Sequence, residues 1–83
     1  GDAPQAKAYF EKAMAASKGK FYFVQYHFAR HYAVRIQDRR LFQKLAQEAV
    51  QGHAGDLKDA CLINSVMQQK TKDLLDMTED LFL

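Results

Sequence analysis

The sequence predicts an all-α fold of four helices, joined as antiparallel helical hairpins. Two observations lead to this class. The 83 residues contain one proline and four glycines, and their apolar residues recur at helical spacing instead of alternating with polar ones. The turn residues fall between the apolar stripes and leave only short loops, so neighbouring helices are expected to pack antiparallel in a single helical domain covering residues 1–83.

The first helix is expected over residues 3–17. Asp2 is expected to cap its start, and Pro4 lies in its first turn, where a missing N–H costs little. Gly19 is placed to take the left-handed conformation that ends a helix. The apolar stripe consists of Ala6, Phe10, Ala13 and Met14. The chain therefore starts with a helix that has one packing face.

The second helix, expected over residues 21–35, is apolar on two faces and holds six of the ten aromatic residues. One stripe comprises Phe21, Val24, Phe28, Tyr32 and Ile36. The other comprises Phe23, Tyr26, Ala33 and Val34, interrupted by Arg30. A helix with one solvent-exposed side needs only one apolar stripe for packing. This helix is therefore expected to pack on both sides, or to line a groove or pore.

Two further helices are expected over residues 39–51 and 57–81. Asp38 and Asp56 are expected to cap their starts. The last helix carries its core face at helical spacing on Leu57, Ala60, Cys61, Asn64, Met67, Thr71, Leu74, Leu75, Thr78 and Phe82. As the single cysteine, Cys61 can form no internal disulfide, and it is expected to be a small buried residue.

Charge is unevenly distributed along the chain. Residues 1–53 carry a net charge of +5, and residues 54–83 carry −3. Such halves suit a chain whose ends are neighbours, or which contacts other subunits, better than a protein that binds a polyanion. No apolar run reaches the roughly 20 residues needed to span a membrane, and no signal peptide is visible.

The candidates for chemistry are weak. His27 and His31 have i, i+4 spacing, but Phe28 stands where a zinc-protease helix needs glutamate, so no metal is expected. Arginines beside aromatics could serve a single-stranded nucleic acid, yet the aromatics fall at core spacing. The acidic run at Asp73, Asp76, Glu79 and Asp80 is expected to be a solvated face. We expect no enzyme, no cofactor and no nucleic-acid partner.

A repeat pattern emerges from the first helix. Ala6-x3-Phe10-x2-Ala13 matches the second helix of a tetratricopeptide repeat, a unit of roughly 34 residues. Ala29-x2-Tyr32 then fits a first helix, and Asn64-x2-Met67 takes the equivalent place about one period later. The pattern predicts a fragment of a tetratricopeptide-like α-α superhelix that begins mid-repeat, with one apolar flank uncovered.

An ordered set of short motifs resembles the T component of tripartite ATP-independent periplasmic (TRAP) transporters. The N-terminal motifs are Tyr9-Phe10-Glu11-Lys12-Ala13, Ser17-Lys18-Gly19-Lys20, Tyr26 to Tyr32, and Asp38-Arg39 with Phe42. The C-terminal motifs are residues 62–68, residues 72–75, and Glu79-Asp80-Leu81-Phe82. The similarity covers nearly the whole chain and corresponds to the C-terminal part of the family's usual length.

The resemblance implies a non-enzymatic transport accessory protein of the periplasm. Members are lipoproteins built from tetratricopeptide-like repeats, associate as ring-like oligomers around an apolar pore, and work with the transporter's periplasmic substrate-binding protein. The implied ligands are apolar compounds or organic acids. These 83 residues do not contain the signal and lipid-attachment segments or the upstream repeats that the family shows. The alternative is a generic tetratricopeptide adaptor that binds a partner peptide.

The repeat pattern also predicts a groove for a ligand or partner. In tetratricopeptide arrays the first helix of each pair lines the concave face. This places there Phe23, Tyr26, Arg30, Ala33 and Val34 from the second helix, and Lys58, Cys61, Ser65 and Gln68 from the fourth. Arg30 could hold a carboxylate by a two-pronged contact. The alternative is that Phe23 and Tyr26 pack against an upstream helix or another subunit.

Overall fold

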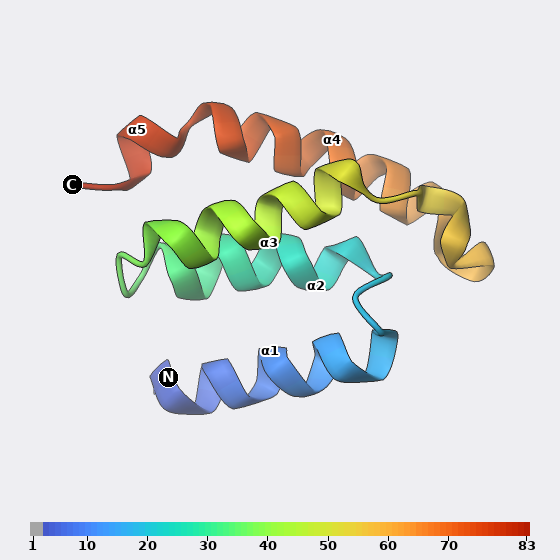
Figure 1. The fold of residues 1–83 in the computed structure, drawn as a ribbon, viewed down its shortest axis with the longest axis horizontal. Helices are drawn as coiled ribbons and strands as arrows, with labels where there is room; N and C mark the ends of the chain where they lie inside the picture. Colours follow the sequence, from blue (N-terminus) through green and yellow to red (C-terminus); the bar gives the residue numbers. More distant parts are fainter. Residues whose placement is uncertain (1–2) are drawn as a thin grey trace.

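The computed structural model describes residues 3–83 and confirms the all-α class, with no strand in that range. The expected cap at Asp2 lies outside the described residues. Successive helices run back and forth, with α1 and α4 on opposite sides of α2 and α3 (Figure 1). None of the helices in residues 3–83 is both long and apolar enough to cross a lipid bilayer.

Helix α1 spans Ala3–Ser17, the range expected from the sequence. Gly19, at φ +72°, follows its last turn, and its N–H donates to the Met14 carbonyl at 3.1 Å. Phe10 stacks on Phe28 with ring centroids 5.1 Å apart. No residue of α1 is fully buried, and its main contacts are with the helix that follows it. Much of α1 therefore faces solvent.

The second predicted helix is not one α-helix. Helix α2, Tyr22–His27, continues into a π-helical segment, η1, Phe28–Ala33. The Val34 N–H donates to the Ala29 carbonyl at 3.2 Å, five residues back. A π-turn takes one extra residue, and one residue corresponds to about 100° of rotation in an α-helix. Ala33, expected on the second apolar stripe that lines the groove, is instead fully buried in the core with Phe28, Ala29 and Tyr32.

Helix α3 spans Arg39–Gln51 and starts as predicted, because the Asp38 carboxylate accepts a hydrogen bond from the Leu41 N–H at 3.0 Å. It packs Phe42 and Leu45 into the core, and Phe82 covers Phe42 with ring centroids 5.0 Å apart. The core thus lies mainly between α2–η1, α3 and the C-terminal helices.

The long fourth helix predicted for residues 57–81 ends at the expected residue, but it begins at Cys61 and is interrupted at Met77. Two 3₁₀ turns, η2 (Ala54–Asp56) and η3 (Lys58–Ala60), precede α4, Cys61–Asp76, and Asp56 caps neither α4 nor a turn. Helix α5, Thr78–Leu81, follows a break at Met77. There the Thr78 hydroxyl donates to the Leu75 carbonyl at 2.5 Å and competes with the helical ladder.

Two further expectations concern the burial of Cys61 and the contact between the basic and acidic parts of the chain. Cys61 is exposed, not buried, because it lies with Leu62 and Ile63 on the solvent side of the first turn of α4. The basic and acidic parts of the chain do meet: Arg39 forms an ion pair with Glu79. Beside it, Gln37 donates to the Leu81 carbonyl at 3.1 Å and accepts from the Leu83 N–H at 3.0 Å. These contacts hold the C-terminus against the start of α3.

Candidate ligand-binding site

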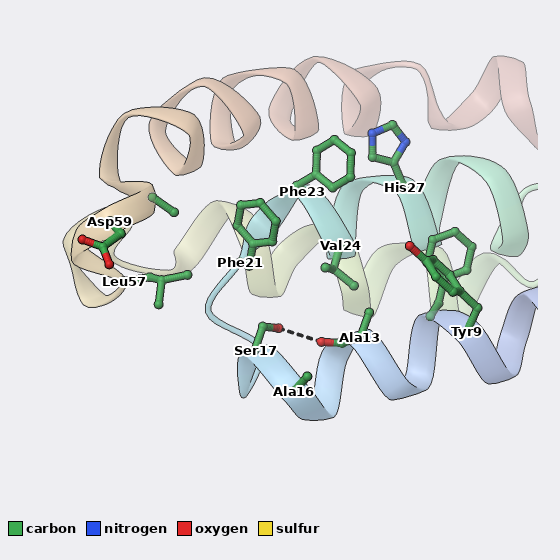
Figure 2. Close-up of a pocket in the computed structure, with 12 residues that line it drawn as sticks. Tyr9, Ala13, Ala16, Ser17, Phe21, Phe23, Val24, His27, Leu57 and Asp59 are labelled. Atoms are coloured by element: carbon green, nitrogen blue, oxygen red, sulfur yellow. Dashed lines mark hydrogen bonds between the residues drawn. The ribbon is translucent and has the colours of Figure 1, made fainter.

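An apolar pocket lies between α1, the start of α2 and the η3 turn, with a volume of about 610 Å³. Figure 2 shows Phe21 and Phe23 together near its middle, Leu57 and Asp59 at one end, and Tyr9 at the other. Ligand pockets in proteins are typically about 300–1,000 Å³ and mostly apolar. The pocket therefore has the size and character of a small-molecule site.

Small residues opposite aromatic ones create this space. Ala13 and Ala16 on α1 and Ala60 in η3 face the aromatic side chains, and an alanine fills little of the gap that a larger residue would close. Phe21 sits at the N-cap of α2 in an extended conformation (φ −107°, ψ 97°). The Ser17 hydroxyl donates to the Ala13 carbonyl at 3.0 Å, so the polar group of this wall is already bonded.

A row of aromatic rings runs from the pocket along α2 into η1. The rings of Phe23 and His27 have centroids 4.2 Å apart, and those of His27 and His31 are stacked at 5.2 Å with planes 7° apart. Burial lowers the pKa of His27, and the nearby charges of His31 and Lys70 lower it further. At neutral pH the imidazole that lines the pocket is therefore uncharged.

The depressed pKa of His27 predicts a loss of stability in mild acid. The unfolded chain takes up the proton at about pH 6.5, before the folded chain does, so stability should fall as the pH drops through that value towards the folded pKa. NMR titration of the His27 ring, with thermal unfolding at pH 7.5 and 5.5, measures both effects.

The control is His31→Gln, which removes one cause of the shift. It should raise the pKa of His27 and weaken the part of the acid destabilisation that His27 causes. A His27 ring that titrates at or above the ordinary histidine value in the unmodified protein would contradict the assignment.

A second, smaller cleft of about 310 Å³ separates α2–η1 from α4. It is lined by Tyr26, Arg30, Lys70, Asp73, Leu74 and Met77. Arg30, Lys70 and Asp73 make this cleft polar, whereas the α1–α2 pocket is mostly apolar. An anionic group in this cleft would meet the positive charges of Arg30 and Lys70.

The structure divides the groove residues predicted from the sequence. Phe23 lines the apolar pocket, whereas Tyr26 and Arg30 line the cleft on the α4 side. Val34 is partly buried against the core, and Lys58 is exposed in η3.

Of the other predicted groove residues, Ala33 is buried and Cys61 is exposed, while Ser65 and Gln68 donate hydrogen bonds to backbone carbonyls. Ser65 is exposed, and its hydroxyl donates to the Cys61 carbonyl at 3.0 Å. The Gln68 amide donates to the carbonyls of Ala49 at 2.9 Å and Gly52 at 2.7 Å. These are acceptors that the end of α3 leaves free, so Gln68 satisfies the C-terminus of α3.

Sequence reasoning missed most of the pocket wall. The sequence places Phe10, Phe21 and Leu57 on packing stripes and gives Tyr9 no role in packing or binding, yet all four line the pocket. The signal that could have found them is the pairing of alanines on α1 with the aromatic cluster on α2. Among residues 3–83, no group of three or more histidine, cysteine, aspartate or glutamate side chains is arranged to hold a metal ion.

Comparison with known proteins places the chain in one family. A family model described as TRAP transporter T-component matches residues 1–82. No curated protein and no solved structure matches the chain.

Proposed function

Because this chain belongs to the TRAP transporter T-component family, we propose that it acts in the periplasm, beside the transporter's substrate-binding protein, and holds an apolar ligand between α1 and α2. The family is one of transport accessory proteins. The observation that carries the proposal is the apolar pocket of about 610 Å³, whose wall is mostly aromatic and alanine side chains. Protein association and ligand binding, without catalysis, are its proposed activities.

The uncovered side of α1 supports the repeat arrangement within this proposal. Ala6, Phe10 and Met14 pack on the core beside α2 and η1, as the second helix of a repeat packs on the next first helix. No residue of α1 is fully buried. Solenoid units bury such flanks against neighbours. We therefore propose tetratricopeptide-like stacking, in which further repeats or other copies of the chain cover this side.

A tryptophan at Ala16 should block the pocket. Ala16 is exposed and lines the pocket, so an indole there fills the space without entering the core. We expect the affinity for a neutral apolar probe, 4-phenylbutan-1-ol, to fall at least about tenfold in NMR titrations, which corresponds to about 1.4 kcal/mol.

Ala15→Trp is the matched control, because Ala15 is exposed on the same helix and does not line the pocket. It should bind the probe as the unmodified protein does. Equal affinity in both variants, or no binding by the unmodified protein, would refute the ligand site. Association with the purified substrate-binding protein is measured separately by biolayer interferometry.

The alternative function, a generic adaptor that binds a partner peptide, is favoured by one observation. The cleft between α2–η1 and α4 carries Tyr26, Arg30 and Lys70 beside the apolar Leu74 and Met77. Such a mixed lining suits a peptide with an acidic side chain. A chain that binds acidic peptides in this cleft, but neither an apolar probe nor the substrate-binding protein, would favour the adaptor.

A further inference from the structure

The α1–α2 pocket has a negative rim and no fixed positive charge in its wall. Among its described lining residues, Asp59 alone carries a formal charge at neutral pH. Burial, with the charges of His31 and Lys70, lowers the pKa of His27 and keeps that imidazole neutral. Arg30 and Lys70 line the other cleft. A carboxylate in this pocket would thus meet Asp59 and lack a cation.

The same wall presents aromatic faces that attract cations. Phe21 and Phe23 lie with ring centroids 5.7 Å apart and planes at 21°. Tyr9 and Phe10 line the opposite end, with Tyr9 69% exposed and Phe23 42% exposed, so their rings are open to a ligand. An ammonium group within about 6 Å of such rings is held by their π electrons.

We infer that the α1–α2 pocket binds an organic ammonium compound, with its apolar body along Phe21 and Phe23 and its charged head near Asp59. This inference rests on the proposed function, because it names the ligand class of the same pocket. Charge complementarity decides it: the wall offers one carboxylate and several aromatic faces. Lys58, the neighbour of Asp59, does not line the pocket. Both side chains are exposed, so salt screens both charges, but only the carboxylate of Asp59 belongs to the pocket wall.

Three probes of matched shape test the charge preference. They are 4-phenylbutylammonium, 4-phenylbutan-1-ol and 4-phenylbutyrate, titrated into the protein at pH 7.5 and low salt and followed by NMR. We expect the ammonium compound to bind about fivefold more tightly than the alcohol, as one cation–π contact and one surface ion pair allow. The carboxylate should bind more weakly than the alcohol.

Two variants separate the contributions. Asp59→Asn should lower the affinity for the ammonium compound about threefold and leave the affinity for the alcohol unchanged. Phe23→Leu keeps an apolar side chain but removes an aromatic ring. It should therefore lower the affinity for the ammonium compound more than the affinity for the alcohol. Asp76→Asn is the matched control, because Asp76 is exposed on α4 and lines none of the clefts described above.

The outcomes distinguish this inference from the proposed function. If the alcohol binds and the affinity for the carboxylate equals or exceeds that for the ammonium compound, the inferred ammonium ligand is wrong but the proposed apolar site stands. An ammonium preference that Asp59→Asn leaves unchanged, or that Asp76→Asn removes equally, also overturns it. Binding of none of the three probes refutes the apolar site and the inference with it.

Discussion

Replacing Asn64 by leucine is expected to lower the free energy of unfolding by about 3 kcal/mol, because it leaves buried backbone groups without partners. The Asn64 side chain is fully buried on α4. Its oxygen accepts from the Tyr22 N–H at 2.9 Å, and its amide donates to the Lys20 carbonyl at 2.7 Å. Tyr22 begins α2, where a helical N–H has no partner within its own helix.

The effect should extend to the pocket. Lys20 and Tyr22 flank Phe21, so the Asn64 amide fixes the turn that carries this pocket residue. Urea unfolding measures the loss of stability. The control is Ser65→Ala, whose exposed hydroxyl bonds only to the Cys61 carbonyl in the described structure and should change stability by less than about 0.5 kcal/mol. Similar losses in both variants would mean that the Asn64 bonds are not the cause.

Gly52→Ala is expected to destabilise the protein by about 3 kcal/mol, through overpacking against a buried ring. A Cβ atom on Gly52 would lie 1.9 Å from the Tyr22 hydroxyl oxygen and 2.4 Å from Cζ. The Tyr22 side chain is 3% exposed and packs with Ala49 and Met67, so it cannot swing away without opening that cluster. Either the ring or the end of α3 must move.

Gly55→Ala is the matched control, three residues along the same connection. A Cβ atom there meets no atom within 4 Å, so this variant should keep its stability or gain a few tenths of a kcal/mol from a stiffer unfolded chain. Thermal and urea unfolding of both variants measure the difference. An unchanged Gly52→Ala protein would show that Tyr22 does not pack on the end of α3 in solution.

The sequence predicts a helix correctly where a single apolar stripe or a single capping side chain determines its bounds. Helix α1 has the expected bounds, and the Asp38 side chain caps α3 as expected. The π-helical segment was not predictable, because its register depends on burying Phe28 and Ala33 against other helices. The start of α4 was likewise missed, since local capping by Asp56 does not occur.

Side-chain roles that depend on distant partners were also out of reach. Asn64 and Gln68 have positions on a helical stripe that reveal nothing of their hydrogen bonds to residues 16–44 positions away in the chain. The pocket was unpredictable for the same reason, since it forms only where α1, α2 and η3 meet. Of the predicted groove set, Phe23 alone lines it, while Arg30 lies on the other side of the aromatic helix.

The aromatic helix serves two sites because successive residues around its axis present their side chains to different neighbouring helices. Phe23 and His27 lie in α2, before the π-helical segment, and line the apolar pocket against α1. Tyr26, also in α2, and Arg30, within η1, line the cleft against α4. Arg30 and Phe23, which the sequence places on one groove face, therefore lie at different sites on this helix. This separation leads to the assignment of an apolar ligand to one side of the helix.

The location of a bound apolar ligand tests this account most directly. Intermolecular NOEs can be recorded between 4-phenylbutan-1-ol and the protein at neutral pH. We predict NOEs from the phenyl ring to Ala13, Phe21 and Phe23, which line the α1–α2 pocket. NOEs confined to Tyr26, Leu74 and Met77 would place the ligand in the other cleft and contradict the account.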